Sequence, residues 1–317
     1  MKIAVIGAGA MGASIGAYAK QGGADLYFVD PFKAHMDAIN EKGLHLVDID
    51  THEEIESVVD SIRCYTDAAD VNEVMDYIFY QVKGMYMDSA IESAGKISDD
   101  HTCHVSLQNG VGNVEKLLDK FAAEHVFYGL VSAGAKMLEP GKVERNFDPE
   151  KSFVSIGAAD KKIHPEMETL KAVFDKTVCV FNLVEDIDPV VWKKMINNCT
   201  ANSICSVARL TLGRLYNNDS GAQLADLIEK EVRAVALAQG IEIPPTPALK
   251  GKFPPEFPHV PSTAQDVFAK KRTEIDTLNG AVCRLGKKYN VPTPYNDALV
   301  MLIKLIEENY QYMIDVK

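Results

Sequence analysis

A lysine and two asparagines are spaced so that they could contact one small ligand. Lys194, Asn198 and Asn202 recur at every fourth position in an apolar stretch that follows Asp188-Pro189. A helix is expected there, because aspartate is a favourable N-cap and proline is tolerated at the first helical position. On a helix, each step of four residues turns the side chain only about 40° further, so the three side chains form one stripe.

The stripe needs polar partners, because its surroundings are apolar. Trp192, Met195 and Ile196 stand among its members, and amide and ammonium groups in such surroundings are costly unless they are hydrogen-bonded. The partners could be side chains of neighbouring helices, which would make the stripe a polar seam inside the domain. They could equally be the atoms of a bound substrate. The stripe alone leaves both interpretations open.

The N-terminal residues have the pattern of a dinucleotide-binding loop. The apolar run 2–6 breaks into a Gly-x-Gly-x-x-Gly motif, and a helix-like segment follows at 13–20. In such a loop the first glycine makes a tight turn, the second admits a pyrophosphate, and the third lets the helix pack on the strand. The phosphates lie on backbone N–H groups at the helix start. The predicted cofactor-binding residues of this loop are Gly7, Gly9, Ala10, Met11 and Gly12.

A carboxylate follows the second predicted strand, 26–29. Asp30 lies eighteen residues after Gly12, where a dinucleotide-binding fold places the acid that binds the ribose 2′-hydroxyl. A carboxylate repels the 2′-phosphate of NADP(H). Asp30 therefore favours NAD(H) as the cofactor.

Two further predicted strands end in polar residues. Residues 76–82 precede Lys83, and residues 102–108 precede Asn109-Gly110. Ligands of open α/β sheets bind beyond the carboxyl ends of the strands, so Gly7, Lys83 and Asn109 are expected to face one crevice. Each also has a simpler interpretation, because a lysine after a strand is commonly a solvated loop residue and Asn-Gly commonly forms a turn.

The elements predict two domains of different class. Strand-like segments between 126 and 157 suggest an antiparallel extension of the sheet, and a helix near 165–175 and a strand near 178–181 follow. Beyond residue 185 the apolar periodicity is helical. The predicted fold is an α/β Rossmann domain, doubly wound and mainly parallel, at 1–185, followed by an all-α substrate-binding domain at 186–317.

Helix-start signals divide the second domain. A Ser-x-x-Gln box at Ser220 is expected to begin a helix that ends before Gly240, and Thr293-Pro294 is expected to cap the final helix. The proline-rich segment 244–261 cannot be helical. Ser262 either caps the next helix or contacts a ligand. That helix is expected to continue through Glu274, which by default would be a solvated charge.

Composition limits the partners and the compartment. A net charge of −12 argues against nucleic-acid binding, and no apolar run reaches the roughly 18 residues of a membrane span. The six cysteines have no metal-ligand spacing, and no secretory signal is expected at the N-terminus. These features predict a cytoplasmic protein that binds a small molecule and no metal, and they leave a homodimer open.

Five motifs in this order resemble the ketopantoate reductase family, which comprises 2-dehydropantoate 2-reductases and related D-2-hydroxy acid dehydrogenases. They are the glycine motif at 7–12, Val82-Lys83, Gln108-Asn109-Gly110, Trp192-x-Lys194-x-x-x-Asn198-x-x-x-Asn202, and Ser262 twelve residues before Glu274 in Thr-Glu-Ile-Asp-x-x-Asn-Gly. The resemblance covers nearly the whole chain. It implies reduction of a 2-keto acid to the (R)-2-hydroxy acid by hydride transfer from a nicotinamide cofactor, within pantothenate biosynthesis.

The resemblance also implies a role for each matched residue. Lys194 would be the general acid, and Glu274 would complete the catalytic pocket. Lys83 and Asn109 would line the cofactor crevice. The implied substrate-binding residues are Asn109, Asn198, Asn202 and Ser262.

Two departures from the family pattern keep alternatives open. NADPH-dependent members commonly carry a basic residue where this chain has Asp30, and His259 stands where the family tends to have a polar substrate-side residue. NADP(H) nevertheless stays open as the family's usual cofactor. The alternative function is an NAD-dependent D-2-hydroxy acid dehydrogenase for branched or aromatic 2-keto acids. A third hypothesis is a catalytically inactive dinucleotide sensor.

Overall fold

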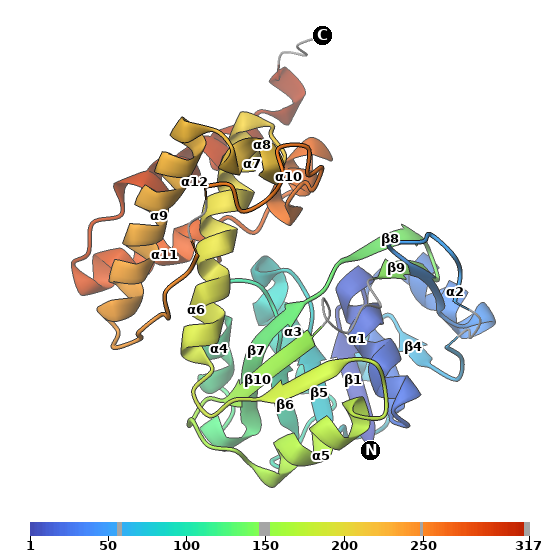
Figure 1. Ribbon diagram of the computed structural model, residues 1–317. Coiled ribbons are helices and arrows are strands. Elements are labelled where there is room, and N and C mark those ends of the chain that lie inside the picture. The colour runs from blue at the N-terminus through green and yellow to red at the C-terminus, as the bar shows by residue number, and fades with distance from the viewer. Residues whose placement is uncertain (56–58, 146–152, 248–249, 314–317) are drawn as a thin grey trace. The chain divides into compact units, whose positions relative to one another are not determined.

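The structure is a computed structural model that describes residues 1–55, 59–145, 153–247 and 250–313. The chain divides into two compact units. The first comprises Met1–Gln108 and Asn113–Ile187, and the second comprises Asn109–Gly112 and the chain from Asp188 onward. Figure 1 shows strands and helices in the first unit and helices in the second.

The first unit is built on a mainly parallel sheet. Within the described residues its strand order is β11-β10-β7-β6-β5-β1-β2-β4, and the pairs are parallel except for β7 with β10. The strands are β1 (Lys2–Ile6), β2 (Asp25–Val29), β4 (Arg63–Tyr65), β5 (Tyr77–Tyr80), β6 (Cys103–Ser106), β7 (Val126–Ser132), β10 (Phe153–Ala158) and β11 (Val180–Leu183).

Helices pack on both faces of this sheet. Ile3 and Val5 of β1 belong to one core, whereas Ala4 and Ile6 belong to the other, as alternation along a strand requires. Helices α1 (Ala10–Gln21), α2 (Lys33–Lys42) and α5 (Pro165–Phe174) contribute to the first core, and α3 (Met87–Ala94) and α4 (Asn113–Leu118) to the second. The predicted doubly wound fold is confirmed.

The predicted antiparallel extension is only partly correct. Strand β10 pairs antiparallel with β7, but β8 (Ala135–Glu139) and β9 (Lys142–Arg145) form a separate sheet with β3 (His45–Asp48). Arg145 of β9, which is 1% exposed, connects the separate sheet to α1. Its guanidinium donates to the Ser14 carbonyl at 2.8 Å and lies 3.8 Å from the centre of the Tyr18 ring.

The second unit is helical, as predicted. Its apolar core is formed mainly by α9 and α6, with contributions from the other helices around them. Its elements are α6 (Asp188–Asn197), a π-helical turn η4 (Asn198–Asn202), α7 (Ser203–Ala208), α8 (Leu212–Tyr216), α9 (Asp219–Leu237), α10 (Ser262–Phe268), α11 (Asn279–Tyr289) and α12 (Pro294–Glu308). Among the described residues, no helix has both the length and the apolar character needed to cross a bilayer.

One predicted helix start in this unit is wrong. The N-cap of α9 is Asn218, whose side chain accepts a hydrogen bond from the N–H of Gly221 at 3.1 Å. Ser220 already lies inside the helix. Asparagine is as good an N-cap as serine, so the sequence offered two starts two residues apart.

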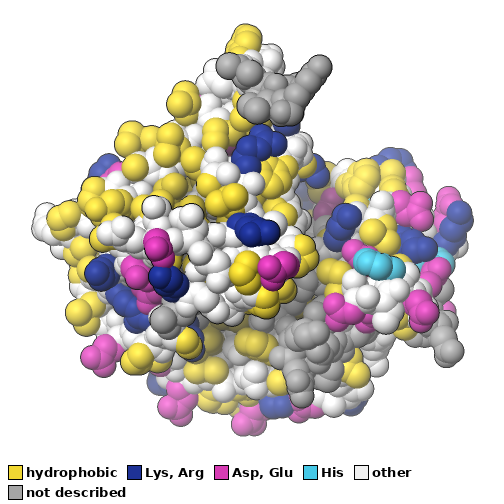
Figure 2. All heavy atoms as spheres, turned by 45° about the horizontal axis from the view of Figure 1, so that its top comes forward, with side chains coloured by type: hydrophobic (Ala, Val, Ile, Leu, Met, Phe, Trp, Pro, Cys, Tyr) yellow, Lys and Arg dark blue, Asp and Glu magenta, His cyan; other side chains and the backbone are white. Residues whose placement is uncertain are grey.

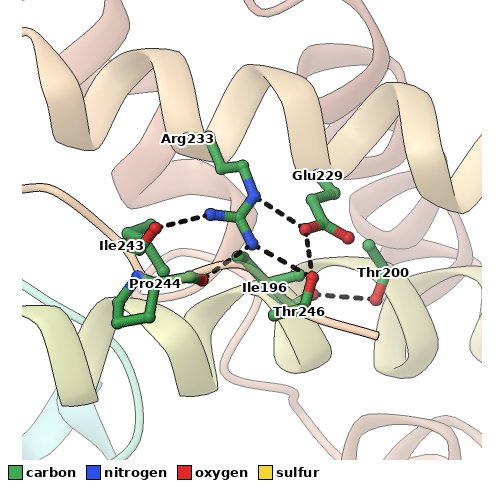
Figure 3. A network of polar contacts seen from close by, with 7 residues as sticks. All are labelled: Ile196, Thr200, Glu229, Arg233, Ile243, Pro244 and Thr246. Atoms are coloured by element: carbon green, nitrogen blue, oxygen red, sulfur yellow. Dashed lines mark hydrogen bonds and ion pairs between the residues drawn. The ribbon is translucent and has the colours of Figure 1, made fainter. Parts of the chain in front are cut away.

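The beginning of the proline-rich segment is bound to α9 through one arginine (Figure 3). Arg233 donates to Glu229 at 2.7 Å, to the carbonyl of Ile243 at 2.9 Å and to the hydroxyl of Thr246 at 3.0 Å. That hydroxyl donates in turn to Glu229 at 2.6 Å. As predicted, the segment 244–261 contains no helix where the structure describes it; residues 248–249 lie outside the description.

Candidate active site

The glycine loop between β1 and α1 has the shape that a dinucleotide requires. Gly7 has φ of +94°, and an added Cβ there would lie 2.7 Å from the backbone nitrogen of Val82. An added Cβ at Gly12 would overlap the carbonyl oxygen of Gly7. At Gly9 it would meet nothing within 4 Å, so open space lies above the middle of the loop.

The start of α1 can bind phosphate. Helix α1 begins at Ala10 after Gly9, and no side chain caps this end. The first helical hydrogen bond is donated by Ala13 to the carbonyl of Gly9 at 2.8 Å. The N–H groups of Ala10, Met11 and Gly12 therefore have no acceptor within the helix. The space above Gly9 and these N–H groups fit the pyrophosphate of a dinucleotide.

Asp30 lies next to this loop at the end of β2. The N–H of Gly7 donates to the carbonyl of Val29 at 3.0 Å, which ties the loop to the strand end. The half-buried Asp30 carboxylate accepts a hydrogen bond from the N–H of Phe32 at 2.8 Å. This bond orients the carboxylate at the carboxyl end of β2, next to the strand that ends at the glycine loop.

The other predicted cofactor residues divide between the two units. Lys83 follows β5, and the side chain of Gln108 donates to the Val82 carbonyl at 2.7 Å, which joins the ends of β5 and β6. Asn109 belongs instead to the loop that packs with the helical unit. The N–H of Val111 donates to the Thr277 carbonyl at 3.1 Å. The structure therefore groups Gly7 with the end of β5 and places Asn109 with the helical unit.

The predicted stripe is present, but its helix is not regular. Lys194 lies on α6, and Asn198 and Asn202 are the first and last residues of the π-helical turn η4. The side chain of Asn202 donates to the Asn198 oxygen at 3.4 Å and to the Ser262 hydroxyl at 3.3 Å. The Asn202 side chain thus lies within hydrogen-bonding distance of two other predicted substrate-binding side chains.

Lys194 and Glu274 form the charged part of this group. Burial lowers the pKa of the Lys194 ammonium to about 8, and the negative charge of Glu274 acts in the opposite direction and raises it. Both residues are half-buried, whereas the neighbouring Lys193 is exposed. A lysine with such a pKa can release and regain a proton near neutral pH.

For the segment that carries Ser262 and Glu274, the structure excludes one of two alternatives and contradicts one expectation. Ser262 does not cap α10, because the N-cap is Pro261 and no side chain binds that end. The helix also does not continue through Glu274. It ends at Phe268, where Lys270 is left-handed with φ of 54° and the N–H of Lys271 donates to the Asp266 carbonyl at 2.8 Å. This is a Schellman end without the usual glycine, so no residue type in the sequence indicates it.

The role of Asn279 was not predicted from the sequence, although the residue is the asparagine of the Thr-Glu-Ile-Asp-x-x-Asn-Gly motif. It is fully buried and donates to the Cys199 carbonyl inside η4 at 3.0 Å. A polar residue at the buried start of a helix is a signal that could have singled it out.

Together, a dinucleotide-binding unit and a helical unit with a lysine of lowered pKa define a nicotinamide-dependent oxidoreductase. Comparison with known proteins agrees. Residues 3–161 match the family described as ketopantoate reductase PanE/ApbA, and residues 186–307 match its C-terminal domain. The chain belongs to the ketopantoate reductase family. It is an NAD(P)H-binding oxidoreductase of the 2-dehydropantoate 2-reductase type, acting on a CH–OH group.

Relatives and solved structures resemble the chain over nearly its full length. A 2-dehydropantoate 2-reductase from Pyrococcus horikoshii is 30% identical, with 97% of this chain and 98% of the relative covered. D-mandelate dehydrogenase with NADH and anilino(oxo)acetate superposes with a TM-score of 0.88 at 25% identity, covering 98% of this chain and all of that one. A ketopantoate reductase from Ralstonia eutropha gives 0.85 at 27% identity, with 98% and 100% covered.

Proposed function

We propose that the protein reduces 2-dehydropantoate to (R)-pantoate, with Lys194 as the general acid. The observation that carries this proposal is the position of a half-buried lysine of lowered pKa beside Glu274, on the helix that also presents Asn198 and Asn202. In this assignment residues 1–185 bind the dinucleotide and residues 186–317 bind the keto acid, with Asn109, which packs with the helical unit, also contributing to substrate binding.

The chemistry requires a cation and a proton at one oxygen. NAD(P)H, when bound, supplies the hydride that adds to C2 of the keto acid. Negative charge develops on the keto oxygen as that bond forms. The Lys194 ammonium stabilises this charge and donates its proton, which completes the hydroxyl group. Glu274 favours the protonated lysine because its charge raises the Lys194 pKa.

The polar side chains around Lys194 suit a carboxylate and hydroxyl groups. Asn198 and Asn202 offer amide N–H groups, and Ser262 offers a hydroxyl that already accepts from Asn202 at 3.3 Å. We assign these three, together with Asn109, to substrate binding. A substrate bound there would be oriented before hydride transfer, which is a large part of what an enzyme contributes to a two-reactant step.

Asp30 supports NADH as the preferred cofactor. Its carboxylate is held at the end of β2 by the N–H of Phe32. A ribose 2′-hydroxyl can donate to this carboxylate, whereas a 2′-phosphate would bring a second negative charge against it. We therefore propose that NADH is used in preference to NADPH.

The same carboxylate favours a second candidate function. An NAD-dependent D-2-hydroxy acid dehydrogenase for branched or aromatic 2-keto acids would use the same Lys194 chemistry. The D-mandelate dehydrogenase that superposes with a TM-score of 0.88 was solved with NADH. Only the part of the pocket that meets the substrate side chain would differ between the two functions.

Initial rates with three keto acids and two cofactors separate these functions. The substrates are 2-dehydropantoate, 2-ketoisovalerate and phenylglyoxylate, each with NADH and with NADPH. The proposal predicts the highest kcat/KM for 2-dehydropantoate with NADH. A higher value for phenylglyoxylate or 2-ketoisovalerate would support the dehydrogenase. No oxidation of reduced cofactor with any of the three would point to a dinucleotide sensor.

The molecule's surroundings are also part of the proposal. We expect a cytoplasmic enzyme. All six cysteines are free and buried, which agrees with a reducing compartment.

We also propose a homodimer, because Met301 and Leu305 of α12 are 65% and 59% exposed on adjacent turns. Figure 2 shows many hydrophobic side chains at the surface of the molecule. Contiguous exposed apolar side chains are typical of protein interfaces.

A further inference from the structure

A buried amide contacts the π-helical turn from outside its helix. Asn279, at the start of α11, is 0% exposed. Its side-chain nitrogen donates to the Cys199 carbonyl at 3.0 Å and to the Asn296 oxygen at 2.9 Å. Its side-chain oxygen accepts from the Ser203 hydroxyl at 2.5 Å. Both hydrogens of the amide and one oxygen lone pair are used, so the side chain cannot rotate without breaking bonds.

The orientation of Asn279 is set by a chain of groups that ends in a carboxylate. Glu231 of α9 is buried and accepts hydrogen bonds from the N–H of Tyr295 at 2.9 Å and from the side chain of Asn296 at 2.7 Å. Because the Asn296 nitrogen points at Glu231, its oxygen points at Asn279. The Asn279 nitrogen must then face both that oxygen and the Cys199 carbonyl.

Two hydroxyl groups bond to backbone carbonyls at the two ends of the π-helical turn. The hydroxyl of Thr200 donates to the Ile196 carbonyl at 2.8 Å, as Figure 3 shows, and that of Ser206 donates to the Asn202 carbonyl at 2.6 Å. Both bonds are made from within the same helix, four residues back. The bond from Asn279 to the Cys199 carbonyl differs, because it comes from another helix, α11.

The turn decides where the last member of the stripe points. In an α-helix Asn202 would be rotated about 40° further than Asn198. A π-helical turn is wider, so side chains four residues apart are brought back toward alignment. In this structure the Asn202 side chain meets both Asn198 and Ser262. If the turn reverted to α-helix, the residues after it would rotate, and the Asn202 side chain would no longer be aimed in the same way at Ser262.

We propose that Asn279 is a positioning residue for the substrate. By binding the Cys199 carbonyl it holds the π-helical turn that aligns Asn198 and Asn202 to receive the keto acid. This inference rests on the proposed function, in which those two amides bind substrate. Asn279 itself contacts neither substrate nor cofactor in this assignment.

The test compares two variants of one buried hydrogen-bond network. Asn279→Leu has a side chain of similar size that cannot bind the Cys199 carbonyl. Ser203→Ala removes another partner of Asn279 and leaves the bond to the carbonyl in place. For each we would measure KM and kcat with the keto acid, the Kd of reduced cofactor by fluorescence, the melting temperature, and hydrogen–deuterium exchange in peptides spanning residues 198–202.

The two variants should both lose stability and should differ in KM. Asn279→Leu should raise KM about tenfold with a smaller fall in kcat and an unchanged cofactor Kd, as expected when a substrate contact is misplaced. Exchange at 198–202 should also become faster. Ser203→Ala should keep KM and the exchange rates near those of the wild type. A lowered melting temperature with KM and exchange unchanged in Asn279→Leu would overturn the proposal.

A second variant and a measurement that needs no activity cover the cases in which the first comparison fails. If Asn279→Leu does not fold, Asn296→Ala removes one acceptor of the Asn279 amide and should raise KM by a smaller factor; an unchanged KM with a lowered melting temperature would then contradict the inference. If wild-type protein turns over no keto acid, the proposed function fails. The exchange measurement needs no activity, and in that case it alone decides whether Asn279 holds the turn.

Discussion

Two opposing effects of its surroundings set the pKa of Lys194. Burial lowers the pKa of its ammonium to about 8, and the charge of Glu274 limits that decrease. A general acid works best when its pKa lies near the pH at which the enzyme operates. The pair therefore gives a proton donor suited to neutral or slightly alkaline conditions.

Glu274→Gln should change the pH profile of the reduction. The acid must be protonated, so the rate of reduction should fall as pH rises through the Lys194 pKa of about 8 in the wild type. Removing the Glu274 charge removes the influence that raises this pKa, so the fall should move to lower pH and the rate at pH 8 should drop several-fold. Initial rates of reduction between pH 6 and 10 measure this.

The control for that profile lies two residues away. The Asp276 carboxylate is bound to Lys304 at 2.6 Å, and Asp276→Asn removes a charge of the same sign. Its profile should follow that of the wild type. A Glu274→Gln profile that also follows the wild type would show that Glu274 does not act on Lys194.

Asp30→Ala should reduce the preference for NADH. The variant removes the acceptor for the 2′-hydroxyl and the repulsion of the 2′-phosphate, a combined effect of about 1–3 kcal/mol, or roughly 5–150-fold in the ratio of the two kcat/KM values. Steady-state kinetics with both cofactors give the ratio. Wild-type protein that uses NADPH as efficiently as NADH would contradict the role assigned to Asp30.

At the residue scale, local spacing predicted the stripe but not its partners. Lys194, Asn198 and Asn202 were predictable because a helical period is a local property. From the sequence alone Glu274 is by default a solvated charge, because it stands in a segment rich in charged residues that includes Arg272 and Asp276. It affects Lys194 only because the fold brings residue 274 back to α6, and such distant contacts leave no mark in local sequence.

At the scale of elements, the glycine loop is specified more tightly than the helix ends. The strand, the three glycines and the following helix were all predictable, because each glycine has its own steric reason. The start of α9 and the end of α10 were not. Asn218 and Ser220 are both suitable caps, and Lys270 adopts a left-handed conformation that glycine usually takes.

The π-helical turn is another feature of an element that spacing could not reveal. A period of four residues fits an α-helix and a slightly wider turn almost equally well over so short a stretch. Its cause lies elsewhere in the fold, in the bond from Asn279 to the Cys199 carbonyl. The stripe was therefore predicted on the right residues but with the wrong helix geometry.

Two glycine variants should separate folding from cofactor binding. Gly9 has φ of −62° and no neighbour within 4 Å of an added Cβ, so Gly9→Ala should fold with a free energy of unfolding near that of the wild type. Its methyl group would occupy the space of the pyrophosphate, and the Kd of NADH should rise about tenfold or more. Fluorescence titration and thermal unfolding measure the two quantities.

Gly12→Ala is the matched comparison. Its Cβ would overlap the carbonyl oxygen of Gly7, so the variant should lose about 1–3 kcal/mol of stability. An unchanged Kd in Gly9→Ala would show that the dinucleotide does not lie on this loop.

At the scale of the whole molecule, the sequence predicted two units of different class. Short apolar runs in the N-terminal part and helical periods beyond residue 185 suffice for that division, because fold class follows from the pattern of elements. The small sheet of β3, β8 and β9 was not predicted. Strand β3 comes from a segment far along the chain from β8 and β9, since its His45 pairs with Lys142, and the two segments meet only in the folded chain.

The exposed apolar face of α12 predicts self-association. Met301→Glu with Leu305→Glu should shift the molecule toward monomer in sedimentation velocity, since charges at the centre of an interface are strongly unfavourable. Val74→Glu, at a position that is 47% exposed in the first unit, should leave association unchanged. A wild-type protein that stays monomeric at micromolar concentration would contradict the proposed dimer.

The general-acid role of Lys194 is tested most directly by single-turnover rates of NADH oxidation with 2-dehydropantoate. Lys194→Ala should lower the rate of the chemical step by about 10²–10⁴-fold, because a positioned acid that also stabilises the alkoxide is lost. The Kd of NADH should stay within a few-fold, since that site belongs to the first unit. Lys193→Ala, at the exposed neighbouring position, should react as fast as the wild type. A Lys194→Ala rate within about threefold of wild type, far less than a general acid contributes, together with a disabled Lys193→Ala, would contradict the mechanism.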